Sequence, residues 1–188
     1  MRIVVGITGA SGVIYGITLL KALTRCRVET HAIVSRQAEV IATMETTYVP
    51  ADICSLATHT YTEDEFTSPV ASGSFLHNGM VIAPCSMKTL AGIAAGYAEN
   101  LIQRAADVTI KEGRRLIIVP RESPFSAIHL ENMLKLARMG VVIAPPVPAF
   151  YHRPETVADL VNFTVGRLLD LLGLENGLVH RWGETSRT

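Results

Sequence analysis

Short runs of β-branched and aliphatic residues alternate along this chain with segments that have the spacing of amphipathic helices. Strands are predicted at residues 2–8, 28–34, 80–83, 116–119 and 141–144. Helices are predicted at residues 13–23, 38–43, 90–95, 101–111 and 127–139, and a last helix is predicted to open at Pro154 and to run to about residue 172. Continuous apolar runs are typical of parallel strands that are buried on both faces. The alternation therefore predicts an α/β fold in which helices cover both faces of a parallel sheet.

The chain has 188 residues, which suits one domain, and we expect a single domain over residues 1–188. The least regular part is residues 48–78, which contain Pro50, Pro69 and the small-residue run 71–74. Connections of this length inside a compact domain are often functional. We expect this segment to be a long connection with some structure of its own.

Composition restricts the classes of partner. Hydrophobic residues make up 48% of the chain and charged residues 18%, which suggests that some apolar surface is hidden between subunits. Lysine plus arginine and aspartate plus glutamate both number 17, so the formal net charge is zero. Nothing in this balance indicates a general binder of nucleic acid or of anionic membranes. Any anion site must therefore be local.

The cysteines and the apolar runs indicate a cytoplasmic protein. Cys26, Cys54 and Cys85 lie far apart, and an odd number of cysteines argues against a disulfide framework. No apolar run approaches the roughly 18 residues of a membrane helix. The N-terminus begins a strand almost at once and lacks the layout of a signal peptide.

The first strand ends in a glycine-rich loop, Gly9-Ala10-Ser11-Gly12, that leads into the first helix. In parallel sheets of this kind, ligands bind beyond the carboxyl ends of the strands. A helix N-terminus presents free N–H groups and a partial positive charge, so it holds phosphate well. The loop is thus a candidate phosphate site, with a plain tight turn as the alternative interpretation.

The same loop excludes two nucleotide-binding motifs. It is not GxxxxGK[ST], which argues against a P-loop, and it is not a clean GxGxxG. A dinucleotide site also needs an acidic residue at the end of the second strand, where this chain has Ser35 followed by Arg36. A mononucleotide phosphate therefore fits better than NAD.

Polar residues also follow the third and fourth strands. Ser86 and Thr89 can donate to phosphate oxygens or to other acceptors of a ligand. Cys85 is either a nucleophile or, as we expect, a small residue packed at the strand end. Arg121 and Glu122 are either a weak surface ion pair or part of a ligand crevice, and their place at a strand end favours the crevice.

Three later residues are further candidates. Tyr151 follows a proline-rich turn, and Arg167 borders the apolar stripe of the last helix. An arginine in that position should be paired or should hold an anion. Lys111 ends its helix, where by itself it is a favourable partner of the helix dipole.

These residues together resemble the flavin prenyltransferases, the UbiX/Pad1 family that was once described as aromatic-acid decarboxylases. The resemblance runs nearly from end to end. It is carried by TGASG (8–12), Ser35, ASGS (71–74), PCSMKTL (84–90), RAADVTIKEGR (104–114), PRESPFS (120–126), HLENML (129–134), PAFYHRPE (148–155) and RW (181–182). The family is flavodoxin-like, so the resemblance implies a three-layer αβα sandwich that binds FMN.

The resemblance also implies roles for individual residues. FMN contacts fall to Gly9, Ala10, Ser11, Ser35, Ser86, Met87, Lys88, Thr89 and Arg121. The residues implied to bind the phosphate of dimethylallyl monophosphate are Lys111, Arg121, Glu122, Tyr151 and Arg167. Which subunit contributes each of them is left open. Catalytic roles fall to Ser11, Glu45, Lys111 and Glu122, and Phe66 takes a place in the isoprenoid pocket where some relatives carry tryptophan.

The implied reaction alkylates reduced FMN at N5 and then at C6 with the dimethylallyl group, and phosphate leaves. Cations would stabilise the departing phosphate, and an apolar wall would exclude water. The resemblance implies no metal, and no DDxxD-like cluster exists in the sequence to hold Mg²⁺ against a diphosphate. It also implies a homododecamer, and it implies that a separate UbiD-type decarboxylase uses the prenylated FMN.

Other activities remain as alternatives. A decarboxylase of cysteine-containing peptides or pantothenoyl-cysteine shares the flavin fold, but its PASANT-type segment is replaced here by ASGS at residues 71–74. An electron carrier would have no use for Lys111, Tyr151 and Arg167 beside a second anion. A direct aromatic-acid decarboxylase would need a site for the acid, and no feature of the sequence requires one.

Overall fold

The computed structural model describes residues 1–179 and 181–183 and contains one six-stranded sheet in which all strand pairs are parallel. The strand order is β3-β2-β1-β4-β5-β6. The strands are β1 (Arg2–Ile7), β2 (Glu29–Val34), β3 (His59–Thr62), β4 (Gly79–Cys85), β5 (Leu116–Pro120) and β6 (Val142–Ile143). Without the edge strand β3, the order is that of flavodoxin-like sheets. The expected flavodoxin-like α/β fold is confirmed.

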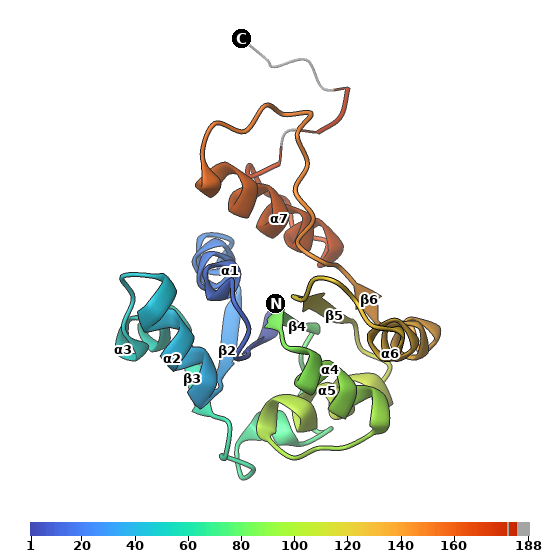
Figure 1. Cartoon of the computed structure of the whole chain (residues 1–188). Coiled ribbons are helices and arrows are strands. Elements are labelled where there is room, and N and C mark those ends of the chain that lie inside the picture. Colours follow the sequence, from blue (N-terminus) through green and yellow to red (C-terminus); the bar gives the residue numbers. More distant parts are fainter. Residues whose placement is uncertain (180, 184–188) are drawn as a thin grey trace.

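Helices form a layer on each face of the sheet (Figure 1). One layer consists of α1 (Val13–Arg25), α2 (Arg36–Glu45), α3 (Pro50–Ser55) and α7 (Val157–Leu171). The other consists of α4 (Met87–Ala95), α5 (Leu101–Lys111) and α6 (Ala127–Arg138), with the short 3-10 helix Pro69–Ala71 beneath α5. Each layer has its own buried cluster, because side chains alternate between the two faces along every strand.

The central strands carry the core. All seven residues of β4 are buried, and so are all residues of β5. These are the apolar runs that predicted a sheet covered on both faces. Within the described residues, none of the helices combines the length and hydropathy that a membrane crossing requires.

Three elements in the segment 48–78 were not predicted individually: α3, β3 and the 3-10 helix Pro69–Ala71. The edge strand β3 reads His-Thr-Tyr-Thr and is only partly covered, so it lacks the apolar run by which the other strands were recognised. It pairs with β2 in register, with His31 opposite His59. The segment is therefore structured, as expected, and adds a sixth strand to the five that were predicted.

The prediction that Pro154 opens the last helix was wrong. Helix α7 begins at Val157, and Thr156 is its N-cap. The Thr156 hydroxyl accepts a hydrogen bond from the Asp159 amide at 3.2 Å, and the Asp159 carboxylate accepts one from the Thr156 amide at 2.8 Å. These two bonds form a capping box, which fixes the start of the helix after Thr156. Pro154 lies two residues before this N-cap and so stays outside the helix.

We expect Gly16→Ala to lower the free energy of unfolding by at least about 1 kcal/mol. A Cβ atom at Gly16 would lie 2.4 Å from the carbonyl oxygen of Ala83 and 3.0 Å from the Ile7 side chain, so α1 would have to move away from β1 and β4. Urea unfolding measures the change. Gly177→Ala is the matched control, because a Cβ atom there meets nothing within 4 Å. Equal stability of the two variants would contradict the packing described here.

Candidate active site

The loops at the carboxyl ends of β1, β4 and β5 are joined by hydrogen bonds through Thr8. The buried Thr8 hydroxyl donates to the carbonyl of Pro84 at 2.8 Å and accepts from the amide of Ser86 at 2.8 Å. The amide of Arg121 donates to the carbonyl of Cys85 at 3.1 Å. These bonds set the positions of three loops that are far apart in the sequence.

The glycine-rich loop forms the start of α1. Gly12 adopts a left-handed conformation with φ of 93°, which favours glycine, and no side chain caps the helix. The amide of Gly12 donates to the Glu45 carboxylate at 2.7 Å, and the amide of Ala10 donates to the Thr8 carbonyl at 2.8 Å. The loop is thus a tight turn, and it also presents backbone N–H groups at a helix N-terminus.

Ser35 and Gly9 position α2 beside this loop. The buried Ser35 hydroxyl accepts from the Ala38 amide at 3.1 Å, which caps α2 and leaves its own proton to donate. A Cβ atom at Gly9 would lie 2.3 Å from Cγ of Gln37, so only glycine lets α2 approach the loop so closely. The contact with Gln37 was not predicted, because nothing in the sequence relates the two residues.

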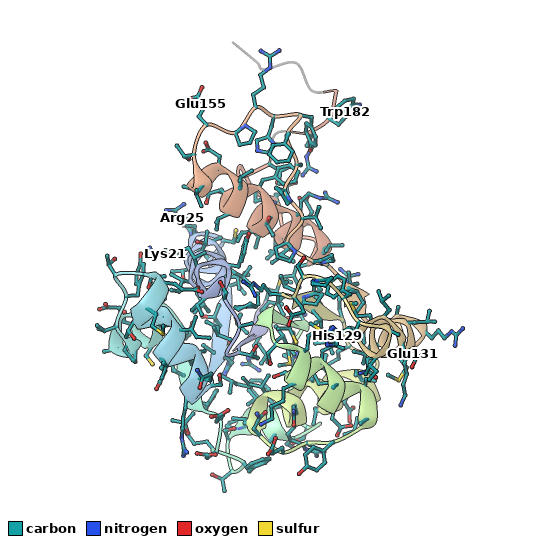
Figure 2. The ribbon with its side chains drawn as sticks, in the orientation of Figure 1. Lys21, Arg25, His129, Glu131, Glu155 and Trp182 are labelled. Atoms are coloured by element: carbon teal, nitrogen blue, oxygen red, sulfur yellow. The ribbon has the colours of Figure 1, made fainter. Side chains whose placement is uncertain are left out.

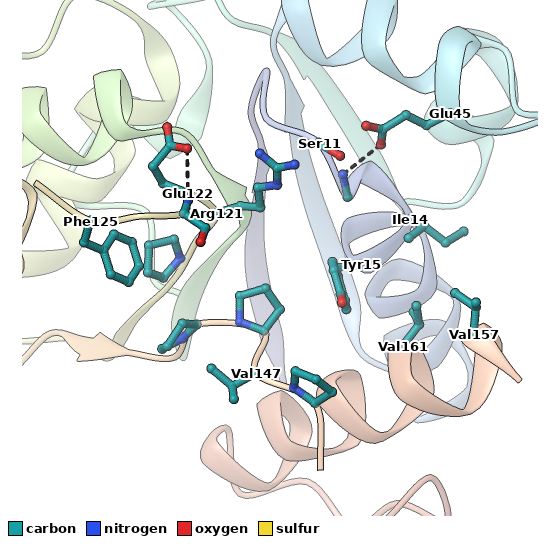
Figure 3. A pocket seen from close by; sticks show the side chains of 16 residues that line it. Ser11, Ile14, Tyr15, Glu45, Arg121, Glu122, Phe125, Val147, Val157 and Val161 are labelled. Carbon is teal, nitrogen blue, oxygen red and sulfur yellow. Dashed lines mark hydrogen bonds between the residues drawn. The ribbon is translucent and has the colours of Figure 1, made fainter. Parts of the chain in front are cut away.

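A cleft of about 750 Å³ lies beside the loop, between the carboxyl ends of the strands and the first half of α7. Its polar groups are Ser11, Glu45, Arg121 and Glu122. Its apolar wall contains Ile14, Tyr15, Phe125, Val147, Val157 and Val161, with the prolines of the β6–α7 connection. Figure 3 shows Arg121 extending from the β5 loop toward Ser11 and Glu45, with Tyr15 and Val147 below. The cleft therefore has a charged end and an apolar end.

The charge of Arg121 is available for an anion. Its side chain has no hydrogen-bond or ion-pair partner among the residues that the structure describes. The Glu122 carboxylate accepts from the amide of Ser123 at 3.0 Å instead of pairing with Arg121. The alternative that these two residues form a surface ion pair is thus wrong.

Ser86 and Thr89 lie at the same edge, outside the lining of the cleft. Ser86 caps α4: its hydroxyl accepts from the Thr89 amide at 3.2 Å and donates to the Thr89 hydroxyl at 3.0 Å. Lys88 forms an exposed ion pair with Glu99 at 3.1 Å, and Met87 packs against the core. Cys85 is fully buried and burial raises the pKa of its thiol, which supports the packing role and not the nucleophile.

A single chain does not bring the other predicted residues to the cleft. Lys111 ends α5, just before β5 begins, so it lies at the amino ends of the strands, opposite the cleft. There it pairs with Glu112. Arg167 pairs with Asp170 at 2.6 Å, and Tyr151 packs edge-on against Phe163 and Trp182. Phe66, in the loop after β3, is exposed and does not line the cleft.

Several lining residues were missed by the sequence analysis. Tyr15 lies in the first turn of α1, where its position after the glycines was a usable signal. Phe125 and Val147 come from loops without periodic pattern. Thr8 was predicted only as a strand residue, although its polar side chain at a buried strand end was a signal for a buried hydrogen bond.

The sequence and the fold have close matches among known proteins. The model of the Flavoprotein family matches residues 1–169. The flavin prenyltransferase UbiX of Methanocaldococcus jannaschii is 52% identical over 183 residues, which cover 97% of this chain and 99% of that protein. A dodecameric FMN-dependent UbiX-like decarboxylase from Escherichia coli O157:H7 matches with a TM-score of 0.96 and 51% identity over 98% of this chain and 100% of that chain. The structure of AnUbiX with FMN and dimethylallyl pyrophosphate matches with a TM-score of 0.96 and 49% identity over 98% of each chain.

A parallel sheet with a glycine-rich loop at its switch point, in a chain that this family model matches over most of its length, defines a flavoprotein. Within that class, the chain belongs to the UbiX/Pad1 family of flavin prenyltransferases.

We expect Thr8→Val to lower the free energy of unfolding by about 2 kcal/mol, because it leaves the Ser86 amide without its acceptor and leaves the Pro84 carbonyl with only the longer bond from the Thr8 amide, at 3.3 Å. Thr8→Ser is the matched control, since it keeps the hydroxyl. Urea unfolding of both variants measures the difference. A stable Thr8→Val protein would mean that the three loops are held by other contacts.

Proposed function

We infer that this protein transfers a dimethylallyl group from dimethylallyl monophosphate to reduced FMN and so makes the prenylated FMN that a UbiD-type decarboxylase uses. The observation that carries this inference is the cleft itself, in which an unpaired arginine and an uncapped helix N-terminus adjoin an apolar wall. Ordinary electron transfer has no use for an apolar wall beside an anion site. The family relationship supports the same reaction.

The described residues fit a flavin mononucleotide. The loop from Gly9 to Ser11 leads into the N-terminus of α1, where a phosphate would be held, and the Ser35 hydroxyl keeps a proton to donate. We assign the flavin contacts to these residues, to the Ser86–Thr89 turn and to Arg121. The bound flavin supplies the nucleophilic N5 and C6 positions.

Arg121 and Glu122 are suited to handle the departing phosphate. The Arg121 guanidinium can form two parallel hydrogen bonds to phosphate oxygens, and its positive charge stabilises the charge that develops on them. We assign proton transfer near the flavin to Glu45 and Glu122, whose carboxylates line opposite sides of the cleft. Ser11 lies between them at the helix start and can donate to the flavin.

The apolar wall keeps water from the allylic cation that forms as phosphate leaves. Val147, Val157 and Val161 offer no nucleophile, and the rings of Tyr15 and Phe125 present faces that favour positive charge. We propose that the reaction uses no metal, because phosphate departure is assisted by cationic side chains. A monophosphate donor fits this arrangement, since it leaves less charge to neutralise than a diphosphate.

Lys111, Tyr151 and Arg167 can act on the same phosphate only from neighbouring copies of the chain. Lys111 lies at the sheet edge opposite the cleft, and Tyr151 and Arg167 lie outside its lining. The dodecamer of the Escherichia coli relative is a precedent for such an assembly. We propose a homododecamer in which these residues complete another copy's site, in the cytoplasm where Cys26 and Cys54 stay reduced.

Purified protein, incubated anaerobically with reduced FMN and the isoprenoid donor, should yield a flavin that is heavier by one C5H8 unit. Mass spectrometry of the extracted flavin measures the product, with the monophosphate and the diphosphate tried in parallel. Arg121→Met should lower the rate at least about 100-fold, because it removes the charge beside the phosphate. Arg25→Met, on the outer end of α1 (Figure 2), is the control and should leave the rate unchanged. Unmodified flavin from FMN-saturated protein with both donors would contradict the proposed reaction.

Mixed assembly tests whether the site is shared. Lys111→Met and Arg121→Met should each be inactive alone. When the two variants are unfolded and reassembled together, we expect about a quarter of the wild-type rate, because random mixing places both native residues at that share of the sites. Continued inactivity of well-formed mixed oligomers would mean that both residues serve the same chain's site.

A further inference from the structure

A second cluster of ligand-type side chains lies toward the amino ends of β2 and β3, whereas the cleft lies at the carboxyl ends of the strands. Glu29 is the first residue of β2, His31 follows two residues later on the same face, and His59 is the first residue of β3. The register places His31 directly opposite His59, and their rings stack with centroids 4.6 Å apart. One ligand atom from each of the three residues lies within 4.8 Å of the others.

We propose that Glu29, His31 and His59 form a binding site for a divalent transition metal of the zinc type. Nε2 of His31 lies 3.0 Å and Nε2 of His59 lies 3.9 Å from the same carboxylate oxygen of Glu29. Ligand atoms of a tetrahedral zinc ion lie about 3.4 Å apart, given bonds of about 2.1 Å. The two distances therefore need changes of a few tenths of an ångström, and the half-exposed His59 ring must turn out of its stack on His31 so that both ring nitrogens point at the ion. Two histidines and one carboxylate are a common zinc ligand set, and they leave a fourth position for water.

Neighbouring groups favour the protonation states in which Glu29 and His31 can bind a metal. Arg2 and then His31 lower the pKa of Glu29 to about 2, so its carboxylate is ionised near neutral pH. Burial lowers the pKa of His31, which favours the neutral imidazole that a metal requires. His59 and Glu29 are partly exposed, with side-chain exposures of 51% and 37%, so an ion can enter from solvent.

Tyr61 supplies the outer support that such a site needs. Its hydroxyl lies 3.0 Å from Nδ1 of His31, on the ring nitrogen that faces away from Glu29. A hydroxyl can donate to that nitrogen or accept from it, so it can follow the change of tautomer when Nε2 binds a metal. Phe75 packs edge-on against the His31 ring at 4.8 Å and fixes its plane.

Arg2 competes with a metal ion for the Glu29 carboxylate and so lowers the affinity of the site. Its Nε donates to the same Glu29 oxygen at 3.0 Å, while its other end donates to the Leu76 carbonyl at 2.9 Å. A cation must therefore displace one arm of Arg2 from Glu29. The site is independent of the proposed reaction, and a bound ion would link the edge strand β3 to β2.

Titration of the full-length protein with ZnCl₂ by calorimetry, and with Co²⁺ by visible absorption, tests this site. We expect saturable binding of one ion per chain, and Co²⁺ bands of a four-coordinate site without the thiolate charge-transfer band that the cysteines would produce. His59→Ala and Glu29→Gln should each weaken binding by more than about tenfold, and Tyr61→Phe by about tenfold. Arg2→Met should bind Zn²⁺ more tightly than the wild type.

His129→Gln is the matched control, because His129 lies on α6 far from the cluster (Figure 2) and glutamine can keep its place in the capping box. Zn²⁺ should also raise the melting temperature of the wild type and of the control, and should leave that of His59→Ala unchanged. His59 is half exposed, so its removal should not prevent folding. Absence of saturable binding, or equal binding by His59→Ala, Glu29→Gln and the wild type, would overturn the proposal.

Discussion

The hydroxyl of Thr8 holds together the ends of the two strands at the centre of the sheet. It donates to the carbonyl of Pro84 near the end of β4 and accepts from the amide of Ser86 just after that strand. The chain leaves β1 toward β2 and leaves β4 toward β5, so the two loops diverge at this point and open a crevice. A buried hydroxyl with both its donor and its acceptor satisfied keeps the crevice at a constant width. The Thr8 hydroxyl thus joins the glycine-rich loop to the Ser86 turn, and a backbone bond from Arg121 to Cys85 joins the β5 loop to the same place.

The site separates its two tasks in space. In the proposed reaction, backbone N–H groups at a helix start and Arg121 bind the anion, and no other described side chain neutralises the charge of Arg121. The apolar half of the cleft comes from α1, the β6–α7 connection and α7. A chain with zero net charge can therefore attract a phosphate locally, while the adjoining wall excludes the water that would compete for a reactive carbon.

One chain contains only part of the predicted site. Lys111 lies at the amino edge of the sheet, so no rearrangement of side chains alone can bring it to a cleft at the carboxyl edge. The exposed apolar residues agree with this incompleteness. Ile128 and Leu134 on α6 are 67% and 51% exposed, and Val157 at the start of α7 is 76% exposed. Surfaces of this kind are typical of contacts between subunits, as the composition had suggested.

Five of the six strands and the residues at their carboxyl ends could be predicted from the sequence, because apolar runs, glycine loops and caps are local signals. It predicted Gly9, Ser35 and Arg121 as candidate site residues, since residues at the carboxyl ends of parallel strands lie at the same edge of the sheet, and of the three Arg121 lines the cleft. It could not show that β3 joins the sheet, because a polar edge strand is defined by its partner and not by its own pattern. Only the tertiary structure decided that Lys111 faces away from the cleft, that Gln37 closes on Gly9 and that His31 meets His59. These are contacts between distant segments, and their geometry depends on how the layers pack rather than on any local preference of the chain.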